Sequence, residues 1–245
     1  MLKKRIIISL TFKDGILFRT KNFIPDYRYT KNFVDFWSID ELILIDVSKN
    51  KFQKNFLNII NFFSNNCFVP ISVGGGISSI KDADLYFSHG ADKVILSSKT
   101  YQNKEILKDI SKKYGNQSIV QSIDYKKNKN KYFLYINSGK KKLNVNPEDW
   151  AKKSISYGAG EILLNSIDND GGLLGYEITF INKLSKQLNC PVLVLGGCGS
   201  WEHILELFEK TSASAACTQN IYHFTNDSIK SAKNFLKKNK IKIRI

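Results

Sequence analysis

The sequence predicts a (β/α)8 TIM barrel, an α/β fold in which eight parallel strands alternate with helices. Short, almost continuously apolar runs, typical of strands buried on both faces, alternate with amphipathic stretches along the whole chain. Eight such runs are present, and 245 residues is a common length for one barrel. We therefore expect a single barrel domain spanning residues 1–245, with a doubly wound open sheet as the alternative.

The eight expected strands are apolar runs that end on polar, acidic or glycine residues. In chain order they are Arg5–Leu10, Glu41–Asp46, Pro70–Gly75, Lys93–Ser98, Ser118–Asp124, Glu161–Asp168, Pro191–Gly197 and Ser214–Gln219. After the fifth run, the stretch KYFLYINSG, which begins at Lys131, predicts a small additional hairpin.

Helices are expected between the strands, where apolar residues recur at helical spacing. In NPEDWAKKSISYG, Asn146 is an N-cap, Pro147 opens the first turn and Gly158 ends the helix. The stretch SIKSAKNFLKK predicts the last helix. The two clearest apolar faces consist of Phe52, Phe56, Ile59, Ile60 and Phe63, and of Ile178, Ile181, Leu184 and Leu188.

The two halves of the chain resemble each other. ELILID, which begins at Glu41, recurs as EILLNSID at Glu161, and SVGGGIS, which begins at Ser72, recurs as VLGGCGS at Val194. A repeat that spans half the chain predicts two half-barrels, each with its own copy of a site.

The net charge of +15 at pH 7 is made almost entirely of lysine. Sites that read bases or fork phosphates usually prefer arginine, so we expect a solvated lysine surface and no nucleic-acid partner. A docking face for an acidic partner or an anionic substrate is the alternative. The only arginines are Arg5, Arg19, Arg28 and Arg244.

No apolar run approaches the roughly 18 residues of a membrane span, and the N-terminal apolar patch is short and lacks a small-residue cleavage site. The cysteines are scattered without CxxC spacing, which predicts reduced thiols in a soluble, cytoplasmic protein with no membrane partner. They are Cys67, Cys190, Cys198 and Cys217.

Two glycine-rich loops follow strands at equivalent places in the two halves. Gly74-Gly75-Gly76 and Gly196-Gly197-Cys198-Gly199 each precede a helical stretch, where backbone N–H groups and the helix dipole favour an anion. Either loop alone also fits a tight turn, but the pair predicts a ligand with two phosphates, one per half. Supporting donors are expected from Ser97, Ser98, Gln219 and Asn220.

The fifth expected strand ends on Asp124, a carboxylate aimed at the mouth of the barrel. By the half-repeat its counterpart is the first strand, which leads to Thr11. Threonine does not donate a proton near neutral pH, so acid–base chemistry by a pair of carboxylates is not available at these two positions.

Six motifs together resemble the HisF family, the cyclase subunit of imidazole glycerol phosphate synthase. They are MLKKRIII…KDG, DELILID, PISVGGGISS, GADKVILSS, WAKKSISYGAGEILLNSIDNDG and the C-terminal YHF. The resemblance covers essentially the full chain. It implies a barrel that takes ammonia from a glutaminase, HisH, to cleave and cyclise a bisphosphorylated ribulosyl nucleotide into imidazole glycerol phosphate and AICAR. The family's catalytic pair of Asp residues falls on Thr11 and Asp124, so here the pair is broken.

This departure, together with Asn165 in LLNSID, resembles the HisF-like branch associated with glycosyl amidation in surface-polysaccharide loci. That resemblance implies a HisH-like glutaminase and a sugar amidotransferase as partners, and ammonia that converts an acetamido sugar group into an acetamidino group. The alternatives are a functioning cyclase of histidine biosynthesis, using Asp124 with another acid such as Asp170, and a scaffold that only activates its glutaminase.

HisF barrels close their N-terminal mouth with a ring of alternating charges that gates ammonia. The resemblance assigns this role to Arg5, Glu41, Lys93 and Glu161, each of which directly precedes an apolar run, and places Asp92 at the partner interface. An ordinary solvated rim of mixed charge is the alternative.

Further candidates lie at the opposite mouth. Asp46 and Asp170, the latter followed by Gly171, are expected either to orient a substrate hydroxyl or to cap loops. Arg19 replaces the lysine usual in HisF and keeps a cation for a phosphate. No metal or cofactor is expected, since the three histidines lack ligand spacing: His89, His203 and His223.

Overall fold

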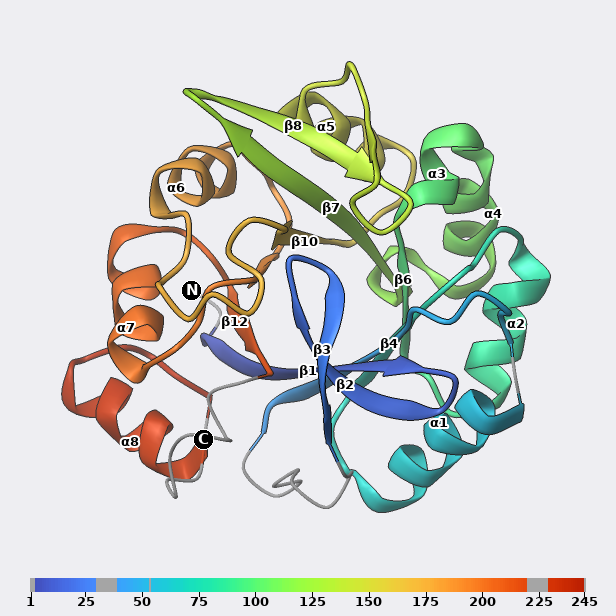
Figure 1. The fold of residues 1–245 in the computed structure, drawn as a ribbon, viewed down its shortest axis with the longest axis horizontal. Coiled ribbons are helices and arrows are strands. Elements are labelled where there is room, and N and C mark those ends of the chain that lie inside the picture. Colours follow the sequence, from blue (N-terminus) through green and yellow to red (C-terminus); the bar gives the residue numbers. More distant parts are fainter. Residues whose placement is uncertain (1–2, 30–38, 53, 220–228, 245) are drawn as a thin grey trace.

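The computed structural model describes residues 3–29, 39–52, 54–219 and 229–244 of the chain. These residues form a closed barrel of parallel strands surrounded by helices, which confirms the predicted (β/α)8 fold (Figure 1). The last barrel strand pairs with the first, Arg5 opposite Ala215, and this closure excludes the open sheet.

All eight predicted barrel strands are present, and each is parallel to its two neighbours. They are β1 (Arg5–Lys13), β4 (Glu41–Asp46), β5 (Ile71–Gly74), β6 (Lys93–Leu96), β7 (Ile119–Asn128), β10 (Glu161–Ser166), β11 (Val192–Leu195) and β12 (Ala215–Thr218). Four strands come from each half of the chain, as the internal repeat predicts.

The helices cover the outside of the barrel (Figure 1). The predicted Asn146 cap is confirmed, because its side chain accepts a hydrogen bond of 2.9 Å from the amide of Glu148. Phe52 lies before the first helix rather than within it. The helices are α1 (Lys54–Asn66), α2 (Ile80–Ser88), α3 (Ser98–Gln102), α4 (Glu105–Tyr114), α5 (Pro147–Ser156), α6 (Ile178–Gln187), α7 (Trp201–Lys210) and α8 (Ile229–Lys238).

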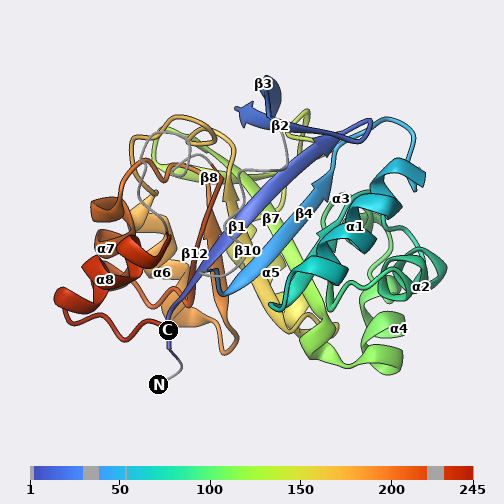
Figure 2. The same cartoon turned by 90° about the horizontal axis from the view of Figure 1, so that it is seen from below.

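Two antiparallel additions extend the barrel wall. The strand β7 does not stop at Asp124, as the sequence suggested, but continues and pairs with β8 (Lys131–Ile136), which forms the predicted hairpin and also pairs with β9 (Lys141–Lys142). The first half has a similar addition that we did not predict: β1 pairs with β2 (Ile16–Lys21), and β2 with β3 (Ile24–Tyr29). Figure 2 shows β2 and β3 at the end of the barrel opposite the N-terminus.

Side chains alternate along each barrel strand between the helices and the barrel interior. On β1, Ile6 and Ile8 pack outward in the large core beneath the helices, whereas Ile7 packs inward. The apolar inward residues fill the middle of the barrel: Ile7, Ile43, Ile95, Val120, Leu163, Leu193, Ala215 and Cys217, with Ile45 and Leu195 packed against them.

The same alternation produces three layers inside the barrel. On β1, Arg5 lies at the N-terminal end, Ile7 in the apolar middle, and Ser9 and Thr11 at the C-terminal end. Six residues of strand correspond to about 20 Å. A charged layer and a polar layer are thus separated by a layer of packed apolar side chains. We call this apolar layer the bore.

No helix in the described ranges is long and apolar enough to cross a membrane.

Candidate active site

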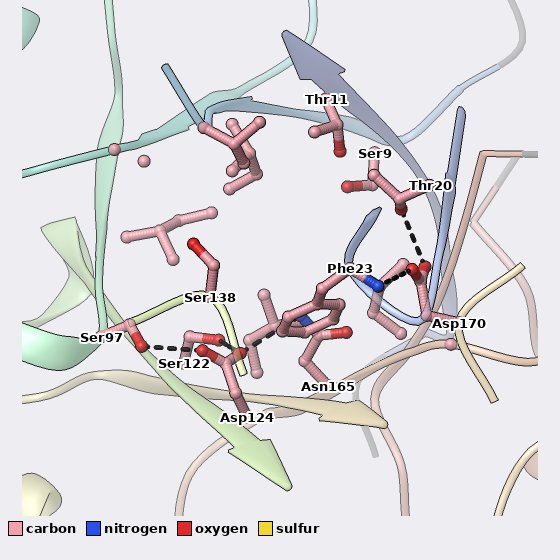
Figure 3. A pocket seen from close by; sticks show the side chains of 18 of the residues that line it. Ser9, Thr11, Thr20, Phe23, Ser97, Ser122, Asp124, Ser138, Asn165 and Asp170 are labelled. Carbon is pink, nitrogen blue, oxygen red and sulfur yellow. Dashed lines mark hydrogen bonds between the residues drawn. The ribbon is translucent and has the colours of Figure 1, made fainter. Parts of the chain in front are cut away.

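A cavity of about 340 Å³ opens at the C-terminal ends of the barrel strands. This is the face at which (β/α)8 enzymes carry their active sites. The cavity brings together most residues predicted for the site (Figure 3): Thr11, Asp46, Gly75, Gly76, Ser97, Ser98, Asp124, Asn165, Asp170, Gly171, Gly197 and Gln219.

The buried carboxylate of Asp124 is held by three side chains. Its Oδ2 accepts a hydrogen bond of 2.8 Å from Ser97, and its Oδ1 accepts bonds of 2.8 Å from Ser122 and 3.2 Å from the amide nitrogen of Asn165. Burial raises the pKa of Asp124 above its usual value, and the three hydrogen bonds oppose the rise only in part. The group is therefore fixed in position and suited to hold a proton.

Thr11 faces this carboxylate from the other side of the cavity (Figure 3). The strands that carry the two residues, β1 and β7, are the first and the fifth of the eight barrel strands, so they stand opposite each other. The position that would complete a pair of carboxylates therefore has a hydroxyl, as the half-repeat predicted.

Asp170 holds the β2–β3 hairpin over the cavity. Its side chain accepts hydrogen bonds of 3.0 Å from Thr20 Oγ1 and 2.9 Å from the amide of Phe23, and its carbonyl accepts one of 3.1 Å from the amide of Asn22. Burial raises the pKa of the Asp170 carboxyl, and the two bonds to its side chain, from Phe23 and Thr20, oppose the rise. The geometry matches the loop-capping role for Asp170, one of the two expected roles.

Three buried oxygen atoms in the cavity wall lack a hydrogen-bond partner among the described residues: the hydroxyl oxygen of Thr218 and two acceptors, Asp46 Oδ2 and Asn165 Oδ1. The other oxygen of Asp46 accepts from the amide of Ser48 at 2.9 Å, and the amide nitrogen of Asn165 is committed to Asp124. Buried acceptors without a donor are costly, so both acceptors are placed to receive hydrogen bonds from a ligand or from water.

Three of the predicted phosphate donors already make hydrogen bonds within the protein. Ser97 donates to Asp124, and Ser98 Oγ accepts a bond of 2.9 Å from the amide of Asn137, which anchors the turn after β8. The Gln219 side chain donates to the carbonyl of Phe18 on β2. These residues organise the cavity wall, and their role toward a phosphate stays a prediction.

The second glycine loop has a clear packing reason for its glycines. A Cβ at Gly197 would stand 2.0 Å from the carbonyl oxygen of Gly175. The amide of Gly175 in turn donates a hydrogen bond of 2.8 Å to the carbonyl of Gly197. A Cβ at Gly199 would stand 2.3 Å from the carbonyl oxygen of Leu173. The tight-turn alternative is therefore satisfied here, whether or not the loop also binds an anion.

The guanidinium of Arg19 pairs with the carboxylate of Asp26 on the neighbouring strand of the hairpin. Arg19 is not among the described residues that line the cavity. Two further predicted residues, Asn220 and His223 with its YHF motif, lie outside the described residues. Among the described residues, no group of three potential metal ligands comes together.

Sequence reasoning missed several lining residues, notably Lys51, Phe23 and Ser138. The available signal for Phe23 was the Asp14-Gly15 pair, which is typical of a tight hairpin turn and here adopts positive φ at both residues. Lys51 carried no signal, because it is one of many lysines in a lysine-rich chain.

At the opposite end of the bore, Arg5, Glu41, Lys93 and Glu161 form a closed ring of ion pairs. Arg5 lies 2.5 Å from Glu41 and 3.0 Å from Glu161, and Lys93 lies 3.0 Å from Glu41 and 2.8 Å from Glu161. Burial alone would raise the pKa of Glu41, but Arg5 and Lys93 outweigh it and lower that pKa. The predicted pairs, Arg5 with Glu41 and Lys93 with Glu161, are joined by two cross-links.

Asp92 is exposed beside this ring, and its Oδ2 accepts a hydrogen bond of 2.8 Å from the amide of Ile71 at the start of β5. The side chain therefore has a structural task at this face. A second task at a partner interface stays a prediction.

One protein family and a set of full-length proteins are similar to this chain. The family model described as "Histidine biosynthesis protein" matches residues 12–227. Proteins called "Imidazole glycerol phosphate synthase subunit HisF" from Clostridium botulinum (strain Kyoto / Type A2) and Hydrogenobaculum sp. (strain Y04AAS1) are 36% identical over 253 residues and 37% identical over 252 residues. In both cases all of this chain and all of the relative are covered.

The chain belongs to the HisF family. The HisF protein of Flavobacterium johnsoniae shows the same relation, with 34% identity and complete coverage of both chains. In this HisF chain Asp124 and Thr11 lie across the cavity from each other, both glycine loops contribute to its lining, and four charges form the ring at the other end of the barrel. The roles that the family resemblance gives to these residues stay predictions.

Proposed function

We propose that this HisF chain is the ammonia-receiving synthase subunit of a glutamine-dependent complex, with a HisH-like glutaminase docked at the N-terminal end of the barrel. The observation that carries the proposal is the closed ring of charges at one end of an apolar bore whose other end opens into the cavity. The relatives support it, since each is called a subunit of a synthase.

The ring and the bore suit a small neutral molecule. Buried charges are strongly destabilising when unpaired, so the four charges of this ring are held in mutual ion pairs. Charge and constriction are general means of selection in pores, and an apolar bore disfavours ions. Ammonia can pass when one ion pair of the ring opens.

For the acceptor we propose the acetamido group of a surface-polysaccharide sugar, converted into an acetamidino group with a sugar amidotransferase as the third component. The cavity favours this chemistry over cyclisation, because Thr11 removes one of two expected acids. Asp170, the nearest substitute, is committed to the β2–β3 hairpin through Thr20 and Phe23.

The second candidate is the cyclase of histidine biosynthesis, which the names of the full-length relatives favour. This chemistry would use Asp124, whose pKa is raised by burial, as the proton donor. The phosphorylated nucleotide would span the two glycine loops.

The test is an assay of the purified chain with the bisphosphorylated ribulosyl nucleotide and ammonium salts, beside a HisF protein that has both acids. We expect turnover to be about 10²–10⁴-fold lower, since one positioned acid–base group is missing. Equal turnover would overturn the amidation proposal and establish the cyclase. Thr11→Asp should raise the rate only if the remaining pocket accepts the nucleotide.

A further inference from the structure

Lys51 lies in the loop between β4 and α1 and lines the cavity beside the first glycine loop. Its stem covers Gly76 so closely that a Cβ at Gly76 would stand 2.5 Å from Lys51 Cγ. Its ammonium donates one hydrogen bond of 2.9 Å, to the carbonyl oxygen of Asp46. An ammonium has three N–H donors, so two can serve a ligand.

The neighbouring peptide presents a further donor at the same place. Tyr86 Oη, buried in the core outside the barrel, donates a bond of 2.8 Å to the carbonyl of Gly75 and so turns that carbonyl outward. A trans peptide holds its C=O and N–H on opposite sides, so the N–H of Gly76 points inward to the cavity. Gly75 packs against the same Asp46 carbonyl that receives the Lys51 ammonium.

Lys51 is also the cation best placed for this role. The charged residues that line the cavity among those described are Asp46, Lys51, Lys99, Asp124 and Asp170. Lys99 is exposed, whereas Lys51 is partly buried.

We propose that Lys51, together with the amide of Gly76, binds the phosphate of a phosphorylated sugar or polyol, in the role that family resemblance gives to Arg19. The guanidinium of Arg19 is instead paired with Asp26 outside the cavity lining. The unpartnered Asp46 Oδ2 is an acceptor beside this site for a hydroxyl of the same ligand. This inference rests on the phosphorylated ligand of the proposed function. It assigns selection of the phosphate group of that ligand to Lys51.

Partial burial favours loss of the Lys51 proton and lowers its pKa, while the charges of Asp46 and Asp14 act in the opposite direction. Phosphate binding through Lys51 should therefore weaken at a lower alkaline pH than binding through an exposed lysine would.

The test is calorimetric titration of the full-length chain with inorganic phosphate and with ribose 5-phosphate, at constant ionic strength. Loss of a charge-assisted bond to phosphate should make Lys51→Met bind about ten-fold more weakly or worse, and Lys51→Arg should recover part of the affinity. Lys54→Met, at the exposed first residue of α1, is the matched control and should lose far less.

Three results would overturn the inference: unchanged affinity in Lys51→Met, a ten-fold loss in Arg19→Met instead, or tighter binding in Lys51→Met, which would show that the lysine stem blocks the loop. The melting temperature without phosphate should stay near that of the parent chain, which separates ligand binding from folding. The titration involves neither glutaminase nor turnover. Failure of ammonia transfer with intact, Lys51-dependent phosphate binding would therefore count against the proposed function alone.

Discussion

At the scale of single residues, the state of Asp124 follows from its surroundings. Three neutral donors, from Ser97, Ser122 and Asn165, fix the carboxylate, but no cation contacts it among the described residues. Burial penalises the charged form more than these bonds favour it, so the folded chain holds the proton more tightly than the unfolded chain does. The ionised form of Asp124 therefore lowers the stability of the folded chain near neutral pH.

The first prediction follows from this linkage. Because the folded-state pKa of Asp124 lies above the unfolded value, the folded chain binds more protons between the two values, and stability falls as pH rises through that window. Asp124→Asn removes the penalty and should raise the melting temperature of the barrel at pH 7, with the gain vanishing below about pH 4. Thermal unfolding from pH 4 to 8 measures this.

The control is Asp109→Asn on α4, where the carboxylate is exposed and no stability change is expected. A gain in Asp124→Asn that does not depend on pH would contradict the linkage. So would a loss of stability at pH 7.

Sequence reasoning reached some of these residues and not others, for a physical reason. Asp124 and Thr11 were found because alternation along a strand fixes the direction of each side chain, even though both strands continue beyond these residues, and the half-repeat fixes the counterpart. Lys51 sits in a loop whose path is determined by packing against Gly76, so no periodicity could place it. The commitment of Arg19 to Asp26 likewise depends on cross-strand pairing in the hairpin.

At the scale of elements, the β2–β3 hairpin determines the depth of the cavity. It carries Thr20 and Phe23 into the cavity lining and is tied down at its turn by Asp170, which lies in the loop after β10 (Figure 3). An element from the first half of the chain is thus held by a carboxylate of the second half. The hairpin is placed to act as a cover whose position depends on a few hydrogen bonds.

The second prediction is that Asp170→Ala loosens this cover. Two bonds to a charged group are lost and the amide of Phe23 loses its acceptor, so we expect roughly 2–4 kcal/mol less local stability in the hairpin. Limited trypsin digestion should then cut faster at Lys21, and phosphate titration should show weaker binding. The matched control is Asp168→Ala in the same loop, which releases only the amide of Lys127. Equal cleavage in both variants would show that Asp170 does not hold the hairpin.

The elements themselves were largely predictable, because apolar runs and helical faces report burial directly. The extensions of β1 and β7 were not, since beyond Phe12 and Tyr125 these strands leave the core and turn polar and lysine-rich. Their partners are antiparallel hairpin strands, which give no signal of burial on both faces.

At the scale of the whole molecule, the ring of charges joins the two halves of the barrel. Its residues come from β1, β4, β6 and β10 and alternate in sign around the barrel, so each carboxylate touches two cations of the ring. Glu41 also lies 3.9 Å from Arg244, which is outside the ring. The family resemblance assigned the members, and the position of each before an apolar run placed them at the N-terminal end of the barrel. The sequence could not close the cycle, because the cross-links depend on how the barrel brings the Arg5 side chain to Glu41 on the neighbouring strand β4 and to Glu161 on β10 across the barrel.

The last prediction concerns this cycle. Lys93→Met leaves two buried carboxylates to share Arg5, and Glu161→Gln leaves two cations to share Glu41, so each single variant should fold but lose about 3–5 kcal/mol of stability. The double variant leaves the pair of Arg5 and Glu41, which has no net charge, and should recover part of that loss.

In a complex reconstituted with the glutaminase, an open ring should let ammonia escape, so more glutamate should be released per molecule of amidated or cyclised product.

The measurement is that ratio of glutamate to product, with glutamine alone and with added ammonium. Ammonium supplied from solution should restore product in the ring variants without changing glutamate release, because it reaches the cavity from the open mouth. Lys113→Met, which breaks an exposed ion pair of 2.9 Å with Asp84, is the control for loss of a salt bridge as such and should leave the ratio unchanged. If Lys93→Met and Glu161→Gln also leave it unchanged, the four charges form only a structural rim, and ammonia does not pass through this barrel.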